Sequence, residues 1–288
     1  NMTRTIALLF LIQLFGLALS FSNHRLQPRR FDTSIYFFGG GGGVSKLPAP
    51  NGRDKQAIES IKAAISKPKN PSFPLVECEF PPLEALNKLG DGSQRSADQV
   101  DAANFAFASK LVKSLAGIPF LGPDVYLLLS AASSSRVINK AQSAIKGASY
   151  VGSLKDGIPE TFKAGDVVVV VSPCISQDYQ MASKLAKDGK ASGVVLINGL
   201  AKGTSSVSGA ATTAYYLKPL TYNSQVVGYL CRNYPNDWAT IDLVSKQVLK
   251  TYKDEEILFG DTNTPDLRGP GNMVQKCVDE RAIQSRKN

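Results

Sequence analysis

Asp166-Val-Val-Val-Val-Val171 is the stretch that decides the fold. Five consecutive valines give both faces of a strand an apolar side chain. A strand that is buried on both faces is typical of a parallel sheet covered by helices. We therefore expect residues 166–171 to form a central strand of a layered α/β domain.

The segments around this strand alternate between helical and strand patterns. Apolar residues at helical spacing predict helices, and short alternating or continuous apolar runs predict strands. The predicted strands are 75–80, 125–129, 150–151, 166–171 and 193–198, and the predicted helices are 54–66, 96–115, 134–145 and 177–188. This alternation predicts an α/β fold in three layers, with a mostly parallel sheet and helices on both faces.

The alternation of strand and helix patterns ends after residue 211. Three strand patterns follow at short intervals, at 212–217, 226–231 and 238–244, and they predict an antiparallel extension near the C-terminus. Residues 248–258 are expected to form a weaker helix or an extended arm. The single α/β domain is expected to span residues 54–260. Residues 261–288 are expected to be a polar tail that ends in a short helix over 273–283.

The N-terminus has the composition of a targeting signal. Residues 1–20 have a basic start and an apolar stretch, and small residues precede a predicted cleavage between Ser20 and Phe21, as in a secretory signal peptide. The apolar stretch is shorter than the roughly 18 residues that a membrane anchor needs. Residues 21–53 form a basic, transit-like segment and a Gly/Pro-rich linker. This combination resembles the two-part plastid signals of diatoms and related algae. The alternative is an ordinary secreted protein with a basic mature N-terminus.

Most of the basic charge lies in this N-terminal part. The net charge is +9, and residues 1–70 hold ten basic and three acidic side chains. That segment carries +7 and the rest of the chain only +2, so the globular part does not support nucleic-acid binding. The only histidine, His24, lies in the same segment. A mature chain without histidine excludes Ser-His-Asp and Cys-His catalysis and His-ligated metals.

Cysteine and glycine spacing excludes further classes of site. The four cysteines stand far apart and form no C-x-x-C motif: Cys78, Cys174, Cys231 and Cys277. A secreted chain would pair them in two disulfides, whereas a stromal chain would keep free thiols, which we favour. The sequence contains neither of the phosphate-binding signatures G-x-x-x-x-G-K-[ST] and G-x-G-x-x-G. We expect no cofactor, no metal and no catalytic residue. The sequence leans away from an enzyme, although chemistry by Asp, Lys, Cys or Tyr stays open.

If a ligand binds, it is expected at the carboxyl ends of the parallel strands. Ser172 follows the valine strand, and Asn198 ends the next one. Ser176 is expected to cap the helix that begins at Gln177, with Asp178 in its first turn. The candidate polar pocket therefore consists of Ser172, Gln177, Asp178 and Asn198. Ordinary cap and turn chemistry explains the same residues, and we favour that interpretation.

Three other features near the strands are open to two interpretations. Cys174 precedes a helix, which can lower the pKa of a thiol, but an inert thiol is favoured because no basic residue is near in sequence. Glu77 and Glu79 share one face of their strand, which favours a solvated edge over a carboxylate pair. Trp238 fits a partner-facing patch, and it fits a core or lid position equally well.

Six motifs occur in the order found in a known family. They are V-E-C-E-F-P-P-L at Val76–Leu83, the helix after Gly92, the valine strand with Ser172-Pro173, the strand end Leu196-Ile197-Asn198, the segment Tyr216–Leu220, and Tyr234-Pro235-x-x-Trp238. In this order they resemble the family catalogued as domain of unknown function 1995. The resemblance covers roughly residues 55–258.

The resemblance implies a plastid-directed protein without established catalytic residues. A plant relative, the low-photosystem-II-accumulation protein 3, is similar over this domain and acts as an assembly factor for photosystem II. We therefore expect a non-catalytic plastid stromal protein that binds protein partners such as photosystem assembly intermediates. We expect no nucleic-acid partner and no permanent membrane span in the mature chain, with peripheral thylakoid association left open.

Two alternatives belong to other classes. The first is a small-molecule or nucleotide-binding module, enzymatic or not, that uses the strand-end pocket. The second and more distant alternative is a secreted, disulfide-bonded protein.

Overall fold

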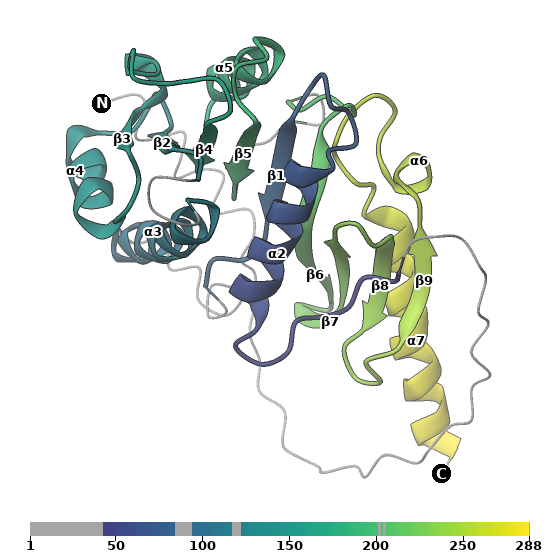
Figure 1. Ribbon diagram of the computed structural model, residues 1–288. Helices are drawn as coiled ribbons and strands as arrows, with labels where there is room; N and C mark the ends of the chain where they lie inside the picture. The colour runs from purple at the N-terminus through teal and green to yellow at the C-terminus, as the bar shows by residue number, and fades with distance from the viewer. Residues whose placement is uncertain (1–42, 84–93, 117–121, 201–202, 204–205, 288) are drawn as a thin grey trace.

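The computed structural model describes residues 43–83, 94–116, 122–200, 203 and 206–287 (Figure 1). The predicted cleavage site between Ser20 and Phe21 lies outside the described residues, as does most of the transit-like segment.

Nine strands of the described chain form one sheet, in the order β3-β2-β4-β5-β1-β6-β7-β8-β9. The first six strands in this order, β3 through to β6 and including β1, pair in parallel. The last three, β7, β8 and β9, continue the sheet in antiparallel pairing. The bounds are β1 Leu75–Glu79, β2 Val125–Leu129, β3 Tyr150–Ser153, β4 Val167–Val171, β5 Gly193–Ile197, β6 Thr212–Tyr222, β7 Gln225–Asn233, β8 Trp238–Asp242 and β9 Val248–Tyr252. The predicted parallel sheet with an antiparallel extension is confirmed.

Helices cover both faces of the sheet, which confirms the three predicted layers. The bounds are α2 Arg53–Ser66, α3 Gln94–Leu115, α4 Ser135–Ala144, α5 Ser176–Lys187, α6 Asp254–Ile257 and α7 Arg268–Lys287, with a 3₁₀ turn at Leu154–Asp156. One face packs against α2, α3 and α4, and the opposite face packs against α5 and α7. In Figure 1, α2 lies in front of β1, while α7 runs behind the antiparallel strands. Among the described residues, no helix combines the length and apolar character needed to cross a bilayer.

The valine strand is β4, and its side chains serve both layers. Val167, Val169 and Val171 pack towards α3 and α4, while Val168 and Val170 pack towards α5. All five are at most 1% exposed. Because burying a valine fully contributes on the order of 1.5–3 kcal/mol, this strand stabilises both helix layers at once.

The connections determine where strand ends meet. From β1 the chain passes through α3 to β2 and through α4 to β3, on one face of the sheet. From β4 it passes through α5 to β5, on the other face. The neighbouring strands β2 and β4 therefore send the chain to opposite faces. Their carboxyl ends form the point where the strand order reverses, which is where open α/β sheets bind ligands.

The C-terminal part matches the sequence expectation only in part, because the predicted helix over 273–283 lies within a longer helix that packs on the sheet. Residues 248–258 form the edge strand β9 and the single-turn helix α6, because Tyr252 and Ile257 are buried against Trp238. The expected tail contains α7, a 20-residue helix that packs on β6, β7 and β8. The apolar stripe of α7 is short, with Val274 as its buried centre. The helical pattern of this segment was therefore hard to recognise in the sequence.

Candidate functional site

Asp178 lies fully buried at the point where the strand order reverses. Its carboxylate accepts backbone N–H bonds from Cys174 at 2.8 Å and Ile175 at 3.1 Å, in the loop after β4. It accepts a third from Ala131 at 2.8 Å, in the loop after β2. A helix N-terminus at this position commonly binds a phosphate or carboxylate. Here the chain supplies that anion itself.

The first turn of α5 differs from the predicted one. Ser176 is the first helical residue and Ile175 holds the cap position, so the prediction that Ser176 caps the helix is wrong. The carboxylate of Asp178, in the first turn, reaches back and accepts a hydrogen bond from the N–H of Ile175, as the third helical residue of a capping box does. Gln177 is exposed on the same turn, and its side chain makes no hydrogen bond with the described residues.

A second polar cluster joins α3 to the ends of β4 and β5. Asn104 donates from Nδ2 to Ser172 Oγ at 2.9 Å, and Asn198 donates from Nδ2 to Asn104 Oδ1 at 2.8 Å. The backbone N–H of Phe80, just after β1, donates to Asn198 Oδ1 at 2.8 Å. Asn104 is 1% exposed and Asn198 is 5% exposed. The amides therefore hold three strand ends and one helix together.

The sequence interpretation missed Asn104. A signal was present, because Asn104 stands in line with Phe107, Ala108 and Leu111 on the buried stripe of α3. A buried amide needs hydrogen-bond partners. Its partners lie 68 and 94 residues away along the chain, at Ser172 and Asn198.

Both strand-end residues have a left-handed backbone. The φ angle is 50° at Ser172 and 47° at Asn198. For residues with a side chain this region costs roughly 1–2 kcal/mol, although asparagine visits it more readily. The hydrogen bonds to Asn104 hold both residues in that conformation, which favours a structural role for this cluster.

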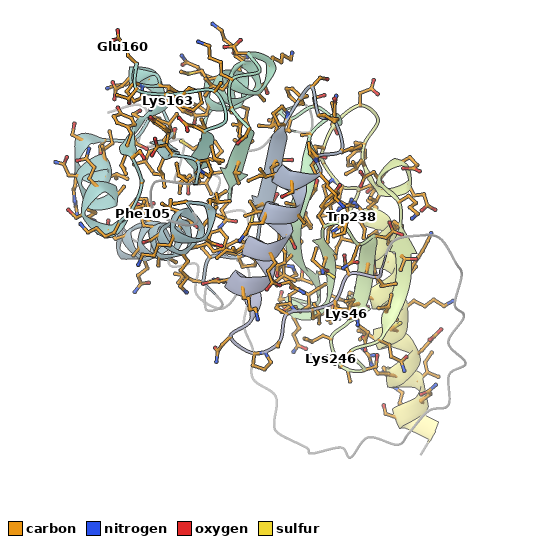
Figure 2. The ribbon with its side chains drawn as sticks, viewed as in Figure 1. Lys46, Phe105, Glu160, Lys163, Trp238 and Lys246 are labelled. Atoms are coloured by element: carbon orange, nitrogen blue, oxygen red, sulfur yellow. The ribbon has the colours of Figure 1, made fainter. Side chains whose placement is uncertain are left out.

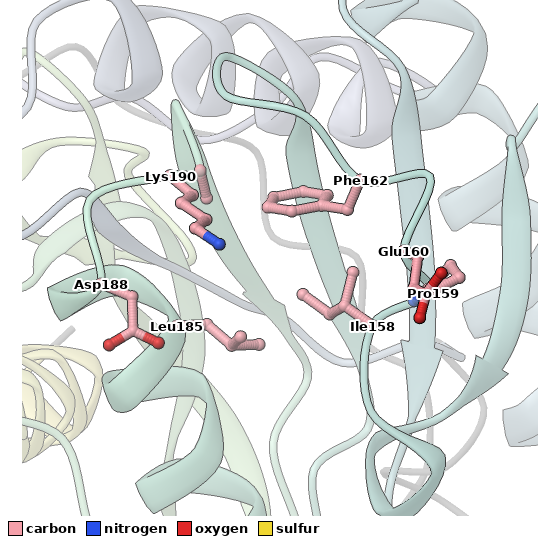
Figure 3. Close-up of a pocket in the computed structure, with 8 residues that line it drawn as sticks. Ile158, Pro159, Glu160, Phe162, Leu185, Asp188 and Lys190 are labelled. Atoms are coloured by element: carbon pink, nitrogen blue, oxygen red, sulfur yellow. The ribbon is translucent and has the colours of Figure 1, made fainter.

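The four predicted pocket residues therefore do not line one cavity. Ser172 and Asn198 belong to the Asn104 cluster, Asp178 belongs to the loop-bridging cluster, and Gln177 faces solvent. Two hollows of the described surface lie elsewhere. One, of roughly 250 Å³, lies beside the end of α5, where Ile158, Phe162, Leu185 and Lys190 point towards one another (Figure 3). The other, of about 510 Å³, lies between β9 and α7.

The thiol of Cys174 has the environment of an inert group, as favoured from the sequence. Burial raises its pKa above the ordinary value of 9.0, and the hydrogen bond to Ser130, with Sγ 3.0 Å from Oγ, opposes this only in part. The four cysteines are free. Among the described residues, no group of three or more His, Cys, Asp or Glu could hold a metal ion.

The prediction that Glu77 lies on a solvated edge is wrong. Glu77 is 7% exposed and accepts a hydrogen bond from Nδ2 of Asn263. The reason is the strand order, because β1 lies between β5 and β6 inside the sheet. Glu79 is partly exposed, and its carboxylate lies 3.8 Å from Nζ of Lys218.

Trp238 lies in the core rather than in a surface patch. It is fully buried, and its ring centroid lies 5.2 Å from that of Tyr216. Its Nε1 donates to Asp254 at 2.9 Å, and Arg232 donates to the same oxygen at 2.8 Å. These contacts fasten α6 to the antiparallel strands.

The carboxyl edge of β4 and β5 also presents two apolar side chains to solvent. Ile175 is 37% exposed and Leu200 is 51% exposed. The N–H of Leu200 donates to the carbonyl oxygen of Pro173 at 2.7 Å. Tyr179 Oη donates to the carbonyl oxygens of Pro173 and Leu200, at 3.2 and 3.0 Å. The two loops that carry Ile175 and Leu200 are therefore held side by side.

Comparison with known proteins identifies the family of this domain. No curated protein shows significant similarity to the chain. A family described as a domain of unknown function (DUF1995) matches residues 54–255, from the start of α2 into α6. Because the match covers most of the chain, the protein belongs to the domain of unknown function 1995 family.

Proposed function

We propose that the protein is a plastid stromal factor without catalytic activity, which binds other proteins during the assembly or maintenance of photosystem II. Family membership supports the proposal through the plant relative that the sequence resembles. The geometry of the strand ends supports the part that concerns protein binding.

The main observation behind the proposal is that side chains of the protein itself already occupy the polar groups at the carboxyl ends of the strands. A small anionic ligand that used the same three backbone N–H groups would have to displace the carboxylate of Asp178. A neutral polar ligand would have to break the bonds of Asn104 with Ser172 and Asn198. Either change would leave buried polar groups unpaired, at about 1–3 kcal/mol for each group.

A protein partner needs no such displacement. Ile175 and Leu200 are exposed at the same edge, on loops that Tyr179 fastens together. Exposed apolar side chains on a fixed backbone suit the centre of a protein interface, which typically buries about 800 Å² on each partner. These two residues would form the apolar centre of a larger contact.

Deletion of the gene tests the proposal directly. We expect photosystem II content to fall, and we expect the unaltered gene to restore it. The Ile175→Glu, Leu200→Glu double variant should restore it poorly. The matched control is Ile283→Glu, at a 53% exposed position on α7, which should restore it fully. Unchanged photosystem II content in the deletion strain would overturn the proposal.

The proposed location rests on the two-part N-terminal signal. A fluorescent protein fused to residues 1–53 should accumulate in the plastid, and the same fusion truncated to residues 1–20 should remain in the secretory route. Secretion of the longer fusion would contradict the plastid assignment and favour the secreted alternative. Peripheral thylakoid association predicts that a salt wash releases the protein from isolated membranes.

The small-molecule alternative makes an opposite prediction. If the domain binds nucleotides or sugar phosphates at the strand ends, such compounds should raise its Tm by mass action. We expect no compound of this kind to stabilise the protein. A saturable rise in Tm that the Asp178→Asn variant loses would favour the alternative.

A further inference from the structure

We propose that β9 and the facing side of α7 form a groove that binds an extended acidic segment of a partner protein as an added strand. The inference rests on the proposed protein-binding function and names a second surface with the kind of partner that fits it.

The outer edge of β9 is open for strand pairing. β9 is the last strand of the sheet and pairs only with β8. Within the described part of the chain, no backbone hydrogen bond joins its outer side to another segment. Val248 is 42% exposed, and β9 contains no proline that would block a partner. An edge of this kind is a template for an added strand.

A hollow lies directly beside this edge. α7 packs on β6, β7 and β8, and it leaves a gap along β9. One stripe of α7 together with Leu249 lines the hollow of about 510 Å³: Gly269, Asn272, Met273, Lys276, Cys277 and Glu280. Figure 1 shows α7 running alongside β9. An added strand would pair its backbone with β9 and place an apolar side chain against Leu249, Met273 and Cys277, which is how edge-binding domains combine affinity with specificity.

The charges along the edge select an acidic occupant. Lys246 and Lys250 are exposed and have no ion pair among the described residues. Lys246 projects from the turn between β8 and β9, at the lower right of Figure 2. The nearest carboxylate on the hairpin, Asp242, is buried and bound by Arg281 at 2.9 Å. These two positive charges of the edge therefore have no ion-pairing acid on the hairpin, and the one carboxylate among the residues that line the hollow, Glu280, lies 3.9 Å from Lys276.

The same charges argue against a second copy of this chain as the occupant. If two β9 strands paired antiparallel about a twofold axis through their middle, Lys250 of one copy would face Lys250 of the other. Like charges directly opposite each other destabilise a strand pair, and edge lysines commonly prevent self-association in this way. An acidic segment would instead place a carboxylate opposite Lys250, and this pair would attract.

Titration of the purified, ¹⁵N-labelled mature protein with defined peptides tests the inference. The probe is a capped six-residue peptide of alternating valine and glutamate, and its matched control has lysine in place of glutamate. We expect the glutamate peptide to shift the backbone amide signals of residues 248–252 and 269–280, and the lysine peptide to leave them unchanged. Absence of shifts in these amides, or equal binding of both peptides, would overturn the inference.

Variants show where the peptide binds, and they test the groove independently of the proposed function. Lys250→Glu should weaken binding of the glutamate peptide by about fivefold or more, and Met273→Trp should weaken it by filling the hollow without adding a charge. Lys184→Glu, at an exposed position on α5, should bind as the parent does. Unchanged binding by both groove variants would overturn the inference. If the peptide does not bind but gene deletion lowers photosystem II content, the groove fails and the proposed function stands.

Discussion

The carboxylate of Asp178 accepts a hydrogen bond from the backbone N–H of Ala131 at 2.8 Å. This bond links the loop after β2 to the helix after β4, across the place where the chain leaves the sheet towards opposite faces. A position that binds ligands in many α/β proteins is closed here by a side chain of the protein itself.

Replacing Asp178 should therefore destabilise the fold. Asp178→Asn keeps the shape but removes the charge, and its amide nitrogen cannot accept a bond from a backbone N–H. We expect the free energy of unfolding in urea to fall by about 2–3 kcal/mol. Asp188→Asn, at the exposed far end of α5, should change it by no more than about 0.5 kcal/mol. Equal effects of the two substitutions would contradict the bridging role.

The buried cluster around Asn104 gives a second prediction. Asn104→Ala leaves the hydroxyl of Ser172 and the amide of Asn198 without their partner, so we expect a loss of about 1–3 kcal/mol. Gln99→Ala, at an exposed position on the same helix, is the control. The loss should appear in urea unfolding, and amide exchange should quicken around residues 172 and 198. A stability like that of the control would show that the cluster does not hold these strand ends.

Local patterns predicted the strands and helices, whereas long-range pairing could not be predicted from them. Five valines in succession indicate a doubly buried strand wherever it lies in the sheet. In contrast, the burial of Glu77 depends on β1 inserting between β5 and β6, which no local pattern encodes. The bond between Asn104 and Asn198 depends on the same strand order. The helix start was misassigned because Ser176 suits a cap in sequence, whereas the backbone geometry puts the apolar Ile175 at the cap position and Asp178 in the first turn.

Asp254 gives the fold a pH dependence with a defined sign. Burial alone would raise its pKa, but Arg232, Trp238 and Lys69 together hold it below the ordinary value of 3.8. The stabilisation is fully present where the unfolded carboxyl is ionised, above about pH 4, and it is lost as pH falls through the lowered folded pKa. Acid should therefore weaken the contact between α6 and the sheet.

Asp254→Asn tests this dependence. At pH 7 we expect a loss of about 3–5 kcal/mol, because buried Arg232 is left without its carboxylate. The difference from the parent should shrink as urea unfolding is repeated below pH 4. Asp237→Asn is the control, because its partner Lys253 is half exposed and the pair should contribute about 1 kcal/mol or less. A difference that stays constant from pH 7 to pH 3 would contradict the assignment.

The thiols should react slowly with alkylating reagents. Burial raises the pKa of Cys174, and it also raises the pKa values of Cys78 and Cys231. Since the thiolate is the reactive form, alkylation of Cys174 by iodoacetamide should rise with pH to a midpoint above 9. Peptide mass analysis at several pH values measures this midpoint, and Cys174→Ala identifies the signal. A midpoint below about 7.5 would indicate an activated thiol and revive an enzymatic interpretation.

Gly228 in β7 leaves the space into which α7 packs. A Cβ atom at this position would lie 2.5 Å from Cγ1 of Val274 and 2.7 Å from the carbonyl oxygen of Ile241. Gly228→Ala should therefore destabilise the protein by about 1–3 kcal/mol. Adding Val274→Ala should not restore full stability, because the contact with the backbone of Ile241 remains. Gly269→Ala, a helical position with no neighbouring atom within 4 Å, should be neutral or stabilising. If Gly228→Ala instead unfolds at the same urea concentration as the parent, neither Val274 nor the backbone of Ile241 approaches this position so closely in solution.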